Sequence, residues 1–138
     1  MDAKIRVGNG IKIEVNDDGD YIVAHVEDHN FIDRFYGLIE KLKGIHASLK
    51  AEESKGLSEK EQLDLVKDKM LEIMRAIDEL FGQDTCKKVF GSGIVPNGYL
   101  IAEFFEQLEP IFREYAVKRQ DTISQKYNRN RGHGHNRR

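Results

Sequence analysis

The sequence predicts a mainly helical protein of the α+β class, in which an N-terminal β-hairpin precedes a bundle of three long helices plus one short helix. Apolar residues alternate with polar ones within the first 26 residues, and after that they recur at three- and four-residue steps. Hydrophobic residues then nearly vanish from about residue 120. We therefore expect one domain over residues 1–119, with the hairpin at about 4–26, and a disordered basic tail over residues 120–138.

The hairpin is predicted from strict alternation before a polar turn and an apolar strand after it. Ile11, Ile13 and Val15 alternate with charged residues, and residues 21–26 form the returning strand. The connection at 16–19 reads Asn-Asp-Asp-Gly, which are residue types that tolerate positive φ. Ile5 and Val7 leave open a third short strand, in which case the hairpin becomes a meander.

The central helix has the clearest boundaries. Ser58 followed by Glu61 fits a capping box, and Gly82 comes directly after the last apolar residue, where a left-handed C-terminal cap favours glycine. Between them the spacing of the apolar residues predicts one buried face. Its members are Leu63, Val66, Met70, Ile73, Met74, Ile77, Leu80 and Phe81.

The other helices are predicted from the same spacing. A first long helix starts at one of residues 28–30 and includes two interior glycines, Gly37 and Gly44. Asp84 is expected to cap a short helix that ends at Phe90, and Asn97 is expected to cap the last long helix. Pro110 lies inside that last helix and predicts a kink or a break.

The aromatic pair Phe104 and Phe105 lies in the last helix. Adjacent residues do not share one helix face, so we expect one ring to be left for a partner or for a second core layer, which gives a hint of self-association.

Composition narrows the class of protein. The chain has 138 residues, one cysteine and a net charge of −2, and a lone cysteine excludes an internal disulfide and most zinc sites. No apolar run approaches the ~20 residues of a membrane span, and the start lacks a signal-peptide pattern. We expect a cytoplasmic protein that does not interact with membranes.

Candidate reactive residues are few. Cys86 lies near a predicted helix start beside two lysines, which favours a reactive thiol, but a small buried residue is the stronger interpretation. His133 and His135 form a poor metal site, because closed sites need four fixed ligands. No nucleophile with a base and an orienting group stands out, so we expect neither an enzyme nor a bound cofactor or metal.

The charge is distributed unevenly. From Lys118 onward seven basic residues face one acid, whereas residues 1–117 carry 15 bases and 23 acids. Arginines of the tail, with Tyr127, could contact phosphates and stack on a base, so a small nucleic-acid-binding regulator is the alternative function. The acidic body opposes this interpretation, which makes a solubilising or protein-binding tail the stronger one.

One segment resembles a known family. Residues 81–91, Phe-Gly-Gln-Asp-Thr-Cys-Lys-Lys-Val-Phe-Gly, look like the FGxxTCxKVFG segment of small proteins encoded among the tail genes of Gram-positive tailed phages and prophages. Residues 104–111, followed by Tyr115 and the Asn/Arg-rich end, resemble their C-terminal helix and tail. The resemblance extends over about residues 11–131. Such proteins look like the tail assembly chaperones of siphovirus-type phages.

This resemblance implies a non-enzymatic chaperone that coats the tape-measure protein, a long coiled-coil client, before the tail tube polymerises. Coating a long client also favours a homo-oligomer. An amphipathic surface with helical spacing suits a groove that binds a client helix. The candidate partner-binding residues are aromatic: Phe81, Phe90, Tyr99, Phe104, Phe105 and Phe112.

Overall fold

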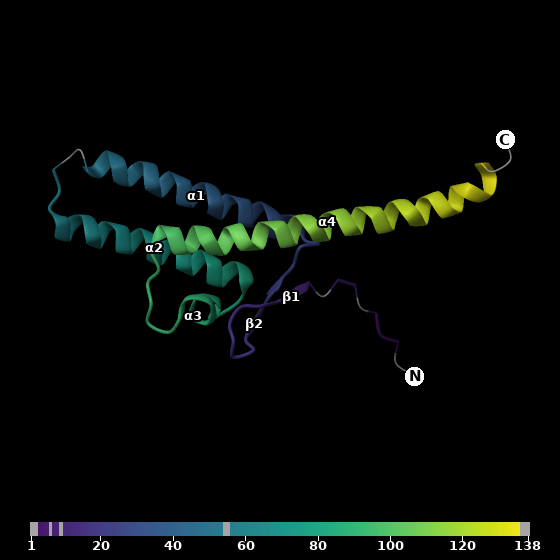
Figure 1. Cartoon of the computed structure of the whole chain (residues 1–138), viewed down its shortest axis with the longest axis horizontal. Helices are drawn as coiled ribbons and strands as arrows, with labels where there is room; N and C mark the ends of the chain where they lie inside the picture. The colour runs from purple at the N-terminus through teal and green to yellow at the C-terminus, as the bar shows by residue number, and fades with distance from the viewer. Residues whose placement is uncertain (1–2, 6, 9, 54–55, 136–138) are drawn as a thin grey trace. The chain divides into compact units, whose positions relative to one another are not determined.

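The predicted fold class is confirmed by the computed structural model, which describes residues 3–5, 7, 8, 10–53 and 56–135. Strands β1 (Ile11–Glu14) and β2 (Tyr21–Ala24) precede the helices α1 (His29–Glu53), α2 (Glu59–Phe81), α3 (Thr85–Phe90) and α4 (Gly98–His135) (Figure 1). The chain divides into two compact units, residues 1–105 and 106–138. The predicted division after residue 119 differs from this one and stays a prediction.

The two strands form an antiparallel hairpin whose turn is built around Asn16. Its side-chain oxygen accepts hydrogen bonds from the backbone N–H groups of Asp18 (2.9 Å) and Asp20 (3.2 Å). Its amide nitrogen donates to the Asp20 carboxylate (2.8 Å) and to the carbonyl of Lys88 in α3 (3.1 Å). One side chain therefore both closes the turn and ties the hairpin to α3. The third strand considered for Ile5 and Val7 is not formed among the described residues.

Helix α1 begins as the sequence indicates. The side chain of Asp28 accepts a hydrogen bond from the backbone N–H of Asn30 at 2.9 Å, which satisfies one of the free donors at the helix start. The buried face of α1 consists of Phe31, Phe35, Leu38 and Ile45. Gly37 and Gly44 lie outside this face, and a Cβ atom built on either would meet no atom within 4 Å. These two glycines therefore do not serve a close helix contact within the chain.

The open space at these glycines leads to a prediction. The variants Gly37→Ala and Gly44→Ala should each raise the free energy of unfolding by up to about 1 kcal/mol, because alanine loses less backbone freedom in a helix. Denaturant titration of each single variant and of the double variant measures the effect, and the two gains should add. A loss of stability in either single variant would contradict the open environment.

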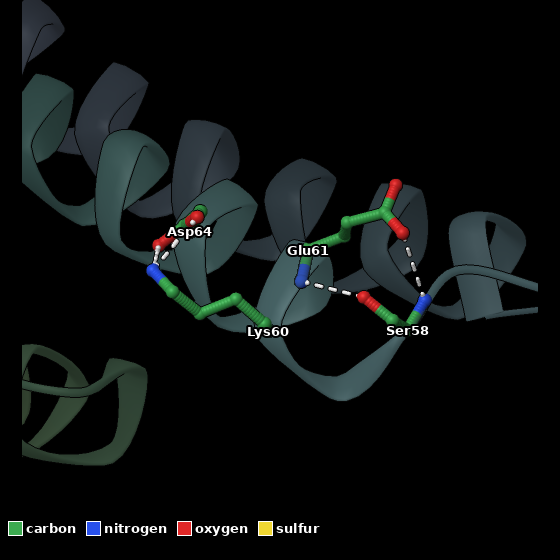
Figure 2. Close-up of polar contacts among 4 residues, drawn as sticks. All are labelled: Ser58, Lys60, Glu61 and Asp64. Atoms are coloured by element: carbon green, nitrogen blue, oxygen red, sulfur yellow. Dashed lines mark hydrogen bonds and ion pairs between the residues drawn. The ribbon is translucent and has the colours of Figure 1, made fainter.

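Helix α2 starts at the predicted capping box. The Glu61 N–H donates to Ser58 Oγ (3.2 Å), and the Ser58 N–H donates to the Glu61 carboxylate (3.3 Å), as Figure 2 shows. Gly82 ends the helix with φ 122° and ψ 158°, so the positive φ is confirmed but the conformation is not the left-handed helical one that was expected. This extended geometry turns the chain directly into α3.

The last turn of α2 also supplies the cap for α3. Asp84 occupies the N-cap position with φ 67°, yet its side chain makes no capping hydrogen bond, which corrects the role predicted for it. Asp78 of α2 accepts the hydrogen bond from the Cys86 N–H instead, at 2.9 Å. Asp84 has the left-handed conformation, the Thr85 N–H donates to the Gly82 carbonyl at 3.3 Å, and the Cys86 N–H is satisfied by a carboxylate from the neighbouring helix.

The first two turns of α4 pack on the other helices through aromatic rings. Phe104 lies 5.8 Å from both Phe81 and Phe90, and Phe105 lies 5.7 Å from Phe35, measured between ring centroids. Both rings are buried, so of the two expected outcomes the second core layer is the one that forms, and neither ring is left for a partner. Adjacent residues point about 100° apart on a helix. Here one ring reaches α2 and α3 while the other reaches α1, so both are covered.

Helix α4 is longer and more continuous than the sequence suggested. It starts at the predicted cap, where the Leu100 N–H donates to the Asn97 side chain (2.9 Å), and it is not interrupted at Pro110. The helix extends to His135, residues 136–138 lie outside the described part, and the disorder expected for residues 120–138 stays a prediction. Residues 111–131 contain neither glycine nor proline. Pairs four residues apart, Glu109–Arg113 and Glu114–Lys118, support such a helix locally without a core.

Candidate binding groove

The apolar face shared by α1 and α2 is covered over only part of its length. The two helices continue beyond the point where α4 begins (Figure 1). Near that covering, Met70, Ile73 and Ile77 of α2 are buried, with 0–3% of each residue exposed. Towards the start of α2 the same apolar stripe opens, with Val66 half-buried and Leu63 67% exposed. The apolar stripe of α2 is therefore longer than the part of it that is buried. Its uncovered part forms an apolar surface.

This uncovered part is a groove of about 570 Å³. Helix α1 forms one wall, α2 forms the second, and the start of α4 closes one end. The apolar lining residues are Leu42, Ile45, Leu49, Val66, Met70, Tyr99 and Ala102. Its volume lies within the range of about 300–1,000 Å³ that is typical of ligand pockets.

The polar residues of the groove give it a positive character. Lys43 and His46 both come from α1, and no Asp or Glu occurs among the lining residues. Lys43 has a partner on its own helix, because its amine lies 3.6 Å from the Glu40 carboxylate. Both Lys43 and His46 are exposed, so the charge of Lys43 is available to a ligand that enters the groove. A ligand that is apolar on one side and acidic along an adjacent edge would be complementary to this lining.

The start of α4 lies against α1 at one end of the groove. A Cβ atom at Gly98 would lie 3.9 Å from Leu42 Cδ1, an ordinary contact distance, so the first residue of α4 already lies against α1. Tyr99 follows it and is 83% exposed, which makes it the most exposed aromatic ring that lines the groove. A side chain this exposed adds little to folding, so its value as a groove wall can be tested without unfolding the chain.

The six predicted partner-binding residues fall into two groups. Phe81, Phe104, Phe105 and Phe112 are buried, and Phe90 is half-buried against Phe104, so these five contribute to packing within the chain. Tyr99 alone of the six lines the groove. The sequence analysis missed the aliphatic lining, because Leu42, Leu49 and Val66 have the same spacing as true core residues. Only the position at which α4 starts distinguishes these groove-lining residues from core residues.

Cys86 is buried at the start of α3, as the stronger interpretation of the sequence held. Its Sγ donates to the Met74 carbonyl at 3.4 Å. Burial, followed by the charge and hydrogen bond of Asp78, raises the pKa of the thiol from 9.0 to about 12. A nucleophilic cysteine requires the opposite shift, so Cys86 has the environment of an inert core residue.

The raised pKa predicts a loss of stability in alkali. The folded chain keeps the Cys86 thiol protonated up to about pH 12, whereas the unfolded chain releases that proton above about pH 9. The stabilising contribution is thus complete below pH 9 and is lost as the pH rises from 9 to 12. Between pH 8 and pH 10 we expect the native chain to lose roughly 1–1.5 kcal/mol more than Cys86→Ala. Denaturant titrations at both pH values measure this difference, and parallel losses in the two proteins would contradict it.

Two other sequence candidates find no support as sites. The side chains of His133 and His135 lie outside the described residues, and the described part of the chain contains no group of three or more His, Cys, Asp or Glu residues that could hold a metal ion. Within that part, no helix has the length and apolar character needed to cross a membrane.

The fold defines a small helical protein with an N-terminal hairpin and an apolar groove that has Lys43 at its edge. Residues 18–138 match the model of a family described as "Family of unknown function (DUF6673)", and the chain belongs to this family. Comparison with curated proteins and with solved structures gives no match.

Proposed function

We propose that this chain is a non-enzymatic assembly chaperone of a phage or prophage tail, and that its groove holds an amphipathic helix of the tape-measure protein. The groove between α1, α2 and the start of α4 is the observation that carries the proposal. A helix that docks in such a groove buries residues at three- and four-residue steps, and this is the spacing of a coiled-coil client.

The charge of the groove limits which segments of the client would bind there. Lys43 and His46 lie on the α1 side, and the lining contains no carboxylate to oppose them. A client helix with Glu or Asp beside its apolar stripe would place these carboxylates next to the two α1 residues. Such charge pairs at an exposed edge contribute mainly to orientation and to the rate of association. The apolar stripe supplies most of the affinity.

The segment that resembles the tail chaperones has a structural role in this chain. Residues 81–91 form the end of α2, the tight connection and α3, and they place Phe81, Thr85 and Cys86 in the core. The resemblance therefore concerns residues that build the fold. The groove adds the surface that a chaperone needs and that the resemblance does not itself supply.

The test uses co-expression with the long, coiled-coil-rich protein encoded next to this gene. We expect that protein to be insoluble alone, to become soluble with the native chain, and to co-purify with it. Deletion of the gene from the phage should abolish tail tubes, and the native gene should restore them. A neighbouring protein that stays soluble alone, together with normal tails after deletion, would overturn the proposal.

A further inference from the structure

The β-hairpin ends in an apolar row that is only partly covered. Ile22 and Ala24 of β2 are 3% and 0% exposed. Their partners across the hairpin, Ile13 and Ile11 of β1, lie on the same face of the sheet and are only half-buried. Among the described residues β1 pairs with β2 alone, so its other edge has no strand beside it. The apolar row thus stops at an edge that a further strand could extend.

The segment before β1 carries side chains of the kind that could extend this row. Ile5 and Val7 are 87% and 86% exposed, the highest values among the large apolar residues of the described chain. They alternate with basic residues in the period of a strand. We call residues 4–7 the arm. An exposed segment with this apolar alternation is suited to pair with another strand.

The course of the chain keeps the arm away from its own β1. A Cβ atom at Gly10 would lie 2.9 Å from the Ala24 carbonyl, and one at Gly8 would lie 3.1 Å from the Glu27 side chain. Gly10 therefore lies beside the end of β2, and Gly8 lies beside a residue that follows β2. Both glycines have positive φ and are tightly approached, so a side chain at either position would be strained.

The sequence of the arm and β1 has a two-fold pattern. Residues at equal distances before and after position 9 are of matching or complementary types. These pairs are Gly8 with Gly10, Val7 with Ile11, Ile5 with Ile13, and Lys4 with Glu14. Two copies laid antiparallel would set each of these pairs side by side. The apolar pairs fall on one face, and Lys4 meets Glu14 at each end. The same register sets Arg6 opposite Lys12, a like-charge pair that weakens the association without removing its apolar basis.

We propose that two copies of this chain exchange their arms, each arm pairing antiparallel with the free edge of β1 in the other copy. The exchange is isologous, because the same residues are used on both sides. It joins two hairpins into one four-stranded segment and covers Ile11 and Ile13 with Val7 and Ile5 of the partner copy. Charge complementarity between Lys4 and Glu14 fixes the register. This inference concerns the hairpin, and it stands whether or not the groove binds a client.

The first test measures mass by light scattering over a range of concentrations of the full chain. We expect a monomer–dimer equilibrium, weakened about tenfold or more in Ile5→Asp, which places a charge in an apolar pair. The matched control is Val117→Asp, which changes an exposed apolar residue of α4 that does not line the groove and should leave the equilibrium unchanged. A Lys4→Glu variant should weaken the dimer, and adding Glu14→Lys should restore it. A native chain that stays monomeric, or equal weakening by Val117→Asp, would overturn the proposal.

The second test distinguishes exchange from an arm that folds back on its own chain. Lys4→Cys and Glu14→Cys are made in separate proteins, mixed, and treated with a short thiol crosslinker. Because Cys86 is buried, the new thiols should react first. Exchange predicts a crosslinked pair in the mixture and none within either variant alone. Crosslinking that appears only inside the Lys4→Cys/Glu14→Cys double variant would show that the arm closes on its own β1, and the proposal would fall.

Discussion

Replacing Phe35 with alanine should lower the free energy of unfolding by about 3–5 kcal/mol, the largest loss expected from a single substitution in this chain. Phe35 has no exposed surface. Its ring centroid lies 5.7 Å from that of Phe105 and 6.5 Å from that of Phe81, both at nearly perpendicular angles. The ring therefore joins α1 to α2 and to the start of α4. Its removal opens a cavity where three helices meet.

The matched control is the neighbouring residue. Tyr36→Ala removes a ring of similar size from the same helix, but Tyr36 is 43% exposed, so it should cost much less stability than Phe35→Ala. Phe35→Leu keeps most of the volume and should fall between the two. Denaturant titration at low temperature measures all three variants, even where one is unfolded at 37 °C. Equal losses for Phe35→Ala and Tyr36→Ala would contradict the three-helix junction.

The sequence predicts the ends of the elements well because those ends depend on neighbours in the chain. Asp28, Ser58 and Asn97 each form the capping hydrogen bonds expected of them, over two or three residues. Such local chemistry is complete within one turn of helix. The exception is α3, whose cap comes from Asp78, eight residues before Cys86. A cap supplied by another helix depends on tertiary packing, which periodicity does not reveal.

The groove could not be predicted for the same reason. By their spacing Val66 and Ile73 are both predicted to lie in the core. Val66 is only half-buried, however, whereas Ile73 has no exposed surface. The difference arises because α4 starts at Gly98 and leaves the first part of α2 uncovered. For the aromatic pair the sequence left two outcomes open, a partner or a second core layer. Phe104 and Phe105 do not share one face, and two faces of α4 bury them.

Binding of a client helix should be lost when the groove is changed at its exposed edge. Tyr99→Ala should weaken the affinity about tenfold, and Tyr99→Ala with Leu49→Asp should weaken it about a hundredfold or more, because an aromatic wall and an apolar contact are removed together. Tyr99 is 83% exposed, so its replacement should leave the unfolding temperature unchanged. Fluorescence titration with a labelled amphipathic peptide from the tape-measure protein measures the affinity.

The charge of the groove gives the same experiment a sharper form. Lys43→Glu with His46→Glu should weaken binding of a peptide with acidic flanks and strengthen binding of one whose acids are replaced by lysines. The control is Val117→Asp, which alters an exposed apolar residue of α4 that does not line the groove and should not affect either peptide. Unchanged affinity in the Tyr99 variants, or an equal effect of Val117→Asp, would show that the client helix does not bind in the groove. A charge reversal that weakens both peptides alike would instead retain the groove and reject the acidic edge of the client.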